Sequence, residues 1–233
     1  PTLFYDIDFD AASDNPDNWA NRANIDRKIG YLSDKSTLGK NDVALSLADG
    51  ESDGKALSIV DSGNNGLWYI GDCDGYVLPE NAYNGNSIRY EIAFRYENGI
   101  IPAYMKAKDS VFEIEGDGKL YVGSSKIFAA DLAAGQWYHL AVAIDNTEGS
   151  SKIYAWLNGE EKVSGAEIAE FVADSPGFGV NFNGNIGEGI IIDDIKLFVT
   201  PKNVHSGLAI FDTAKTIDSQ EQYMEIPYFN DTG

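Results

Sequence analysis

Hydrophobic and polar positions alternate with a period of two residues along most of the chain. In SIRYEIAFRY (87–96), Ile and aromatic residues take every second position, and Arg and Glu take positions between them. This is the pattern of a β-strand with one buried face. The same alternation recurs in LFYDIDF (3–9), VALSLAD (43–49), KALSIVD (55–61), SVFEIE (110–115), KLYVG (119–123), WYHLAVAID (137–145), KIYAWLNG (152–159), GFGVNFNG (177–184) and GIIIDDIKLFV (189–199).

Gly and Asn residues separate these runs and predict tight turns. Gly116-Asp117-Gly118 predicts a hairpin turn between two short strands, because glycine readily adopts a positive φ. Helical patterns are short: AEIAEFVA (166–173) and DLAAG (131–135) could each form a turn or two of helix. Many short strands with such turns predict an all-β fold, an antiparallel two-sheet β-sandwich of the jelly-roll kind.

One boundary follows Val199, where TPKNVHS leaves the last alternating run. We expect residues 1–200 to form the sandwich and residues 201–233 to form an ordered C-terminal extension or a linker to a further module. The opening PTLFYDIDFD lacks the pattern of a signal peptide, so we expect a processed form or a module of a longer protein.

Composition narrows the possible partners. The chain has 233 residues and a formal charge of −20, so phosphate backbones and anionic lipid surfaces are poor partners. No apolar run approaches the roughly 20 residues of a membrane helix, and we expect no membrane insertion. A secreted protein, a cation binder or a binder of uncharged glycans would suit this charge. The single cysteine, Cys73, lies between two aspartates that disfavour a reactive thiolate.

Several of the runs, taken in order, resemble a known family. GQWYHLAVAID with SKIYAWLNGEEK, together with YDIDFD, GKALSIVD and IIIDDIKLFV, is similar to the strand pattern of concanavalin A-like, laminin-G-like sandwiches, including bacterial carbohydrate-binding modules. The resemblance extends from Tyr5 to Val199. It implies two packed sheets, often a structural calcium, and glycan binding on one sheet or in the end loops. It also implies that Trp137 lies in the core.

Some relatives of this architecture are enzymes, and the resemblance therefore raises the question of catalysis. The glucanases carry Glu-x-Asp-x-Glu or Glu-x-Asp-x-x-Glu on one strand, and no such triplet occurs here. The lyases need Arg-x-Glu-x-Arg; Arg89 and Glu91 begin that pattern, but Ala93 stands in place of the second Arg. These departures favour a binding module. If the protein is instead an enzyme, the candidate catalytic residues are Arg89, Glu91, Arg95 and Tyr96.

Three aspartates are candidate calcium ligands. The first and last strands lie close together in such sandwiches, so Asp8 and Asp10 could share one cation with Asp193, which stands in an apolar series with Ile191 and Ile195. Calcium takes six to eight oxygen ligands, often carboxylates and backbone carbonyls. The alternative is that Asp193 lies at a sheet edge, where it accepts backbone hydrogen bonds or faces water.

Aromatic residues outside the core could stack on sugar rings. Rings with a polar tip suit surfaces that are partly apolar and partly wet. For any one of them, packing beneath a loop is the competing explanation. The candidates are Trp19, Trp68, Tyr69, Tyr76, Tyr83 and Trp156, of which Trp156 should occupy the strand face opposite Ile153, Ala155 and Leu157.

No nucleophilic catalytic group is recognisable. His139 lies inside a strand, where we expect a hydrogen-bonded structural role, and no serine or cysteine triad can be assembled around it. The sequence therefore predicts a non-catalytic, calcium-containing glycan-binding or polysaccharide-binding module of a secreted or cell-surface bacterial protein, joined to other modules. A polysaccharide lyase or glycoside hydrolase of the same fold, and a protein-binding adhesion module, are the alternatives.

Overall fold

The protein is a stack of two antiparallel β-sheets. The computed structural model describes residues 2–7, 9–10, 31–32, 43–52, 54–63, 66–71, 87–107, 109–147, 150–169, 177–182 and 186–200. Within these ranges the regular structure is all strand, and no helix is long and apolar enough to cross a membrane. The expected all-β, two-sheet fold is confirmed. The extension over 201–233 lies outside the described ranges and stays a prediction.

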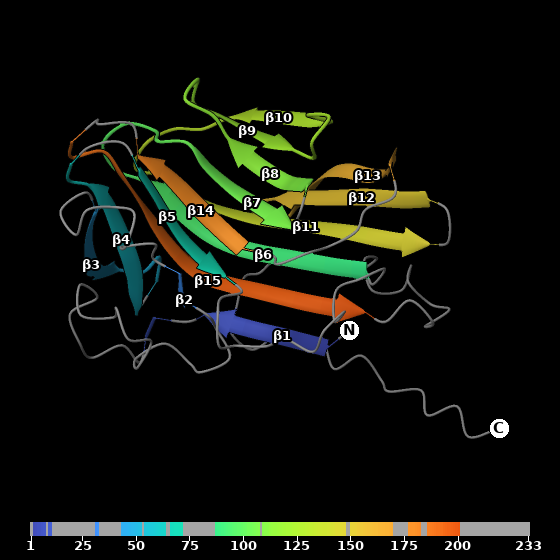
Figure 1. Ribbon diagram of the computed structural model, residues 1–233, viewed down its shortest axis with the longest axis horizontal. Helices are drawn as coiled ribbons and strands as arrows, with labels where there is room; N and C mark the ends of the chain where they lie inside the picture. Colours follow the sequence, from blue (N-terminus) through green and yellow to red (C-terminus); the bar gives the residue numbers. More distant parts are fainter. Residues whose placement is uncertain are drawn as a thin grey trace.

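We call the larger layer sheet A. It has eight strands in the order β13-β12-β11-β6-β15-β4-β3, with β1 also pairing with β15 (Figure 1). Its strands are β1 (Thr2–Ile7), β3 (Val43–Asp49), β4 (Lys55–Asp61), β6 (Ser87–Tyr96), β11 (Trp137–Thr147), β12 (Ser150–Leu157), β13 (Glu160–Ile168) and β15 (Gly189–Thr200).

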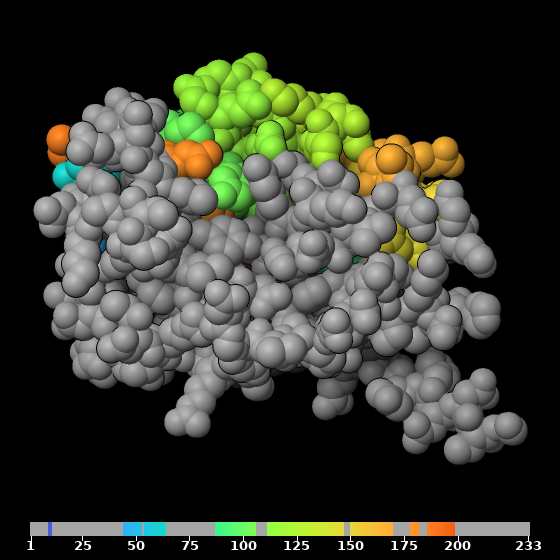
Figure 2. Space-filling model, in the orientation of Figure 1, coloured from blue at the N-terminus to red at the C-terminus, as the bar shows by residue number. Residues whose placement is uncertain are grey.

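The second layer, sheet B, has seven strands in the order β10-β9-β8-β7-β14-β5-β2. In Figure 2 its lime-green strands β8, β9 and β10 project along the upper edge of the view. Its strands are β2 (Tyr31–Leu32), β5 (Gly66–Gly71), β7 (Ala103–Ala107), β8 (Asp109–Ile114), β9 (Lys119–Val122), β10 (Phe128–Asp131) and β14 (Gly177–Phe182).

One hydrophobic core joins the facing sides of the two sheets. Phe94 of sheet A stacks on Tyr138 with ring centroids 5.5 Å apart, and Phe112 of sheet B lies 6.3 Å from Phe178. All four side chains belong to the same buried cluster. The alternation read from the sequence therefore identifies the inner face of most strands, and the residues between the core positions form two outer faces.

The first and last strands are neighbours, as the family resemblance implies. β1 pairs with the second half of β15, and β4 pairs with its first half. A bulge interrupts β15 between Asp193 and Lys196, where Asp194 has a φ of 48°. Before the bulge, Asp193 pairs with the outward-facing Ala93; because the bulge then adds one residue, Ile195 turns into the core. The expected register of Asp193 with Ile195 is therefore wrong.

Two other expectations need correction. Trp137 is only half-buried and lies on the outer face of sheet A, because Tyr138 begins the inward series of β11. The proposed helical turns do not form in the described residues: 166–168 close strand β13, and 131–135 run from the end of β10 into a turn. Pairing of β13 with β12 outweighs the weak local helical preference.

Candidate functional site

The outer face of sheet B carries a row of polar and aromatic side chains in direct cross-strand register. Tyr104 on β7 pairs with Glu113 on β8, and Glu113 pairs with Tyr121 on β9. All three are partly exposed, whereas the residues flanking them in sequence, such as Met105 and Ile114, are buried. Two strand spacings separate the tyrosines, about 9–10 Å. We call Tyr104, Glu113 and Tyr121 the sheet B row.

Tyr104 leans across the neighbouring strand β14. Gly179 pairs with Tyr104, and a Cβ atom placed on Gly179 would lie 2.6 Å from Cζ of Tyr104 and 2.8 Å from its phenol oxygen. The far end of the ring therefore lies directly over the glycine backbone. Partial burial raises the pKa of the Tyr104 phenol above its ordinary value.

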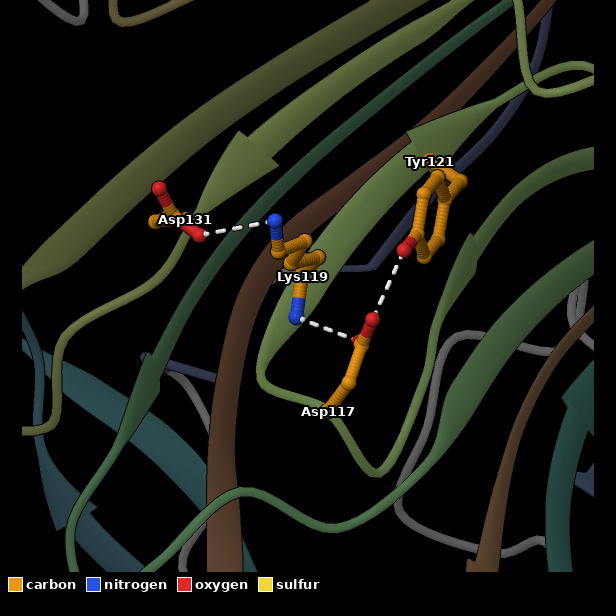
Figure 3. Close-up of polar contacts among 4 residues, drawn as sticks. All are labelled: Asp117, Lys119, Tyr121 and Asp131. Atoms are coloured by element: carbon orange, nitrogen blue, oxygen red, sulfur yellow. Dashed lines mark hydrogen bonds and ion pairs between the residues drawn. The ribbon is translucent and has the colours of Figure 1, made fainter.

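At the other end of the row, Tyr121 is fixed by the β8–β9 hairpin (Figure 3). Its O–H donates to Oδ2 of Asp117 at 2.7 Å, and the backbone N–H of Lys119 donates to Oδ1 at 3.1 Å. The bond to Asp117 raises the pKa of Tyr121 to about 12, and the same bond lowers the pKa of Asp117. Nζ of Lys119 lies 3.5 Å from the exposed carboxylate of Asp131.

A lysine covers one face of the Tyr121 ring. Nζ of Lys126 lies 4.3 Å from the ring centroid and 2.6 Å from Oε1 of Glu115. The bond to Glu115 raises the pKa of Lys126. A ligand that reaches Tyr121 from this side meets an ammonium group already paired with a carboxylate.

On the outer face of sheet A, the aromatic side chains of Tyr154 and Trp156 pack against one another and are less exposed to solvent than the tyrosines of the sheet B row. Trp156 stacks parallel to Tyr154 at 6.3 Å, and the Arg89 guanidinium lies 5.9 Å above the Trp156 ring. Trp156 occupies the face opposite the core, as its spacing predicts, but only 5% of it is exposed. Its packing with Tyr154, Ala141 and Ala143 removes it from solvent, so the expectation of an exposed stacking ring is corrected.

The four candidate catalytic residues, Arg89, Glu91, Arg95 and Tyr96, do not converge on one site. Arg89 pairs with Glu91 at 2.5 Å, and Arg95 pairs with Glu97 at 2.7 Å while lying 5.2 Å over the Trp137 ring. Tyr96 faces the opposite way: it is fully buried in the core.

His139 has the structural role expected of it. Its Nε2 lies 2.5 Å from Oε2 of Glu51, which belongs to the β3–β4 turn, and its backbone N–H donates to the Asn158 side chain at 2.9 Å. Nε of Arg89 and of Arg95 on the same outer face are buried, and neither has a hydrogen-bond partner among the residues that the structure describes.

Two of the three candidate calcium ligands lie beside one turn. The backbone N–H of Lys55 donates to Oδ1 of Asp10 at 2.7 Å. A Cβ atom on Gly50 would lie 3.4 Å from Oδ2 of Asp193, and one on Gly54 would touch Asp10. Both carboxylates therefore lie beside the turn between β3 and β4, Asp193 near Gly50 and Asp10 near Gly54. Asp8 lies outside the described residues, and among those described no three His, Cys, Asp or Glu side chains form a metal-binding group.

The remaining aromatic candidates are described only in part. The backbone of β5 places Trp68 opposite Val180 and Tyr69 opposite Gly179, so Tyr69 extends the register of the sheet B row; the side chains of both lie outside the description. Trp19, Tyr76 and Tyr83 also lie outside it. Sequence reasoning missed Tyr104, Glu113 and Tyr121. The alternation in AYMKA, VFEIE and KLYV could have placed all three on an outer face.

Comparisons with known proteins reveal similarity in fold. No protein-family model and no curated protein sequence matches the chain. The catalytic domain of the glycoside hydrolase family 131 protein from Coprinopsis cinerea superposes with a TM-score of 0.57 at 13% identity, over 86% of this chain and 96% of that one. A family 131 β-glucanase catalytic domain from Podospora anserina gives 0.54 at 12%, over 85% and 96%. A Lotus tetragonolobus seed lectin gives 0.44 at 11%, over 68% and 92%.

The two catalytic domains share the fold of this chain. At such low identity the likeness concerns the β-sandwich alone. The all-β, two-sheet architecture fits the concanavalin A-like sandwich that the sequence resembles.

Proposed function

We propose that the protein binds a glycan, without cleaving it, on the outer face of sheet B. The observation that carries the proposal is the sheet B row, in which two tyrosines and a glutamate lie partly exposed on three adjacent strands. The similar structures support a carbohydrate ligand, because two of them are named as a glycoside hydrolase and a β-glucanase. The row lies on regular strands, which hold side chains more firmly than loops do.

Each member of the row has a chemical role in this proposal. The C–H face of a sugar ring stacks on Tyr104, whose ring is held against β14. Glu113 accepts hydrogen bonds from sugar hydroxyls, and these bonds are stronger for an ionised acceptor. Tyr121 and Lys126 contribute a polar end to the row.

Charge disfavours acidic polysaccharides as ligands. Glu115 and Asp131 pair with Lys126 and Lys119, respectively, so the charges of these two lysines are already neutralised. Glu113 and Asp117 add further negative charge to the same end of sheet B. With a net charge of −20 for the chain, an uncharged glycan is the ligand class we propose.

Hydrolysis is the second candidate function. Glu113 lies on β8, and Glu115 follows Ile114, the last residue of that strand; in extended backbone two residues span about 6.7 Å between Cα atoms. Glycoside hydrolysis uses two carboxyl groups roughly 5–9.5 Å apart. We favour binding because Oε1 of Glu115 lies 2.6 Å from Nζ of Lys126, so this carboxyl group is already engaged in an ion pair.

We also propose a structural calcium at the Gly50–Gly54 turn. The donor types fit: Asp10 and Asp193 supply carboxylate oxygens, and Gly54 places a backbone carbonyl near the carboxylate of Asp193, the ligand types that calcium prefers. Calcium there would link the start of the chain to β15 and contribute no step to binding. We also propose a secreted or cell-surface location beside further modules.

The test is affinity electrophoresis through gels containing single polysaccharides, with calcium and with a chelator. We expect retardation by at least one uncharged polysaccharide and none by alginate. Tyr104→Ala should abolish most of the retardation, while Ile186→Ala, which removes an exposed side chain on a turn, should leave it unchanged. Formation of reducing-sugar or unsaturated products would contradict binding without cleavage and would support the hydrolase or lyase alternative. Equal retardation of both variants would contradict the placement of the site.

A further inference from the structure

Gly179 occupies an unusual place for a glycine. It lies inside β14, a central strand of sheet B, where glycine offers no side chain to pack and weakens the strand. Its φ does not fall in the positive region that would require glycine. The backbone conformation therefore does not require glycine at position 179. Close approach of another group to the backbone is the remaining explanation.

The group that approaches is the ring of Tyr104. A Cβ on Gly179 would lie 2.6 Å from Cζ, 2.8 Å from the phenol oxygen and 3.0 Å from Cε2 of that ring. Distances below 3 Å are incompatible with a real Cβ, so any other residue at 179 must displace the ring. On the other side of β14, Gly179 pairs with Tyr69, so the glycine lies between the backbones of Tyr104 and Tyr69.

We propose that Gly179 is a positioning residue for the glycan site: it lets Tyr104 lie flat across β14 and present a ring face to the ligand. This inference rests on the proposed function. A ring lying on the sheet forms a platform continuous with its neighbours, and such a platform suits an extended polysaccharide lying across the strands. A side chain at 179 would tilt the ring and leave only its edge for stacking.

Gly179→Ala tests the inference without threatening the fold. The backbone at 179 suits alanine, and replacing glycine restricts the unfolded chain, so stability should hold or rise. The displaced atoms are the far end of one side chain, which can move. Gly116→Ala is the matched control, because no atom lies within 4 Å of its Cβ position and its φ is not positive.

The experiment measures affinity for hydroxyethyl cellulose, an uncharged extended polymer, in a double-mutant cycle. We expect Gly179→Ala to weaken binding by about two- to tenfold, the range for one aromatic contact. In a Tyr104→Ala background the same change should have no effect. Gly116→Ala should bind like the wild type.

A second readout follows the ring without any ligand. NMR of ring-labelled tyrosine, with Tyr104→Phe to assign the signal, gives the pKa of Tyr104. Gly179→Ala should shift that pKa down toward the ordinary value, because the ring moves into solvent.

The outcomes separate the two proposals. Wild-type protein that binds neither hydroxyethyl cellulose nor another uncharged polysaccharide overturns the proposed function and the platform together. Wild-type binding that Gly179→Ala leaves unchanged, or weakens equally without Tyr104, overturns the role of Gly179 alone. An unmoved Tyr104 signal in Gly179→Ala also overturns that role.

Discussion

Replacing Tyr96 with Phe should destabilise the protein without changing glycan binding. Tyr96 is fully buried, and its O–H donates to the backbone carbonyl of Ile101 at 2.7 Å. Phe keeps the ring contact with Phe94 but leaves a buried carbonyl without its donor. Such a loss costs about 1–3 kcal/mol. For a domain of this size each kcal/mol lowers Tm by about 2–4 °C.

The pH dependence of this cost gives a sharper check. Burial raises the pKa of Tyr96 far above its ordinary value, so the folded state holds the phenolic proton when the unfolded state releases it. The stability contributed by this proton is fully present below about pH 10, the unfolded pKa, and falls by about 1.4 kcal/mol per pH unit above it. Phe has no such proton. The difference in stability between wild type and Tyr96→Phe should therefore close within about 1–2 pH units above pH 10.

The assay is urea denaturation of both proteins from pH 7 to pH 11.5. A difference that stays constant across this range would refute the reasoning from burial and linkage. A Tyr96→Phe protein that is fully stable at pH 7 yet fails to bind glycan would show instead that Tyr96 belongs to a functional site.

Three further perturbations have defined outcomes. Ser87→Ala removes the O–H that donates to buried Asp145 at 3.0 Å, and urea denaturation should show a loss of about 1–3 kcal/mol; an unchanged midpoint would refute the need for that donor. Chelator should lower the Tm of the wild type but not of Asp193→Asn, which lacks a proposed calcium ligand. Equal Tm values for the wild type with and without chelator would contradict the proposed calcium site. Tyr121→Phe should raise the lowered pKa of Asp117 toward its ordinary value in an NMR titration, because their hydrogen bond is its largest cause; an unshifted carboxyl would contradict that bond.

The sequence predicts the sandwich well because strand alternation directly reports the inner face. In β6, Tyr90 and Phe94 are buried while Arg89 and Arg95 lie outside, as their spacing indicates. The pairing of β1 with β15 followed from the family resemblance. These features depend on local periodicity and on the order of the strands.

The site was less predictable because it depends on register between distant segments. Tyr104 and Gly179 are far apart in sequence, and only the pairing of β7 with β14 brings them together. The bulge at Asp194 inserts one residue and reverses the face of everything after it, which alternation alone cannot show. Trp156 stood on the correct face, but its burial depends on packing with Tyr154 that spacing does not reveal.

The central claim is that the glycan lies on the outer face of sheet B, and hydrogen–deuterium exchange locates it directly. Exchange of the wild type is compared with and without hydroxyethyl cellulose, with Tyr104→Ala as the control. We predict slower exchange in peptides that contain β7, β8, β9 and β14, and no such change in Tyr104→Ala. Protection confined to β6, β11 and β12 of sheet A, or protection that survives in Tyr104→Ala, would contradict the account.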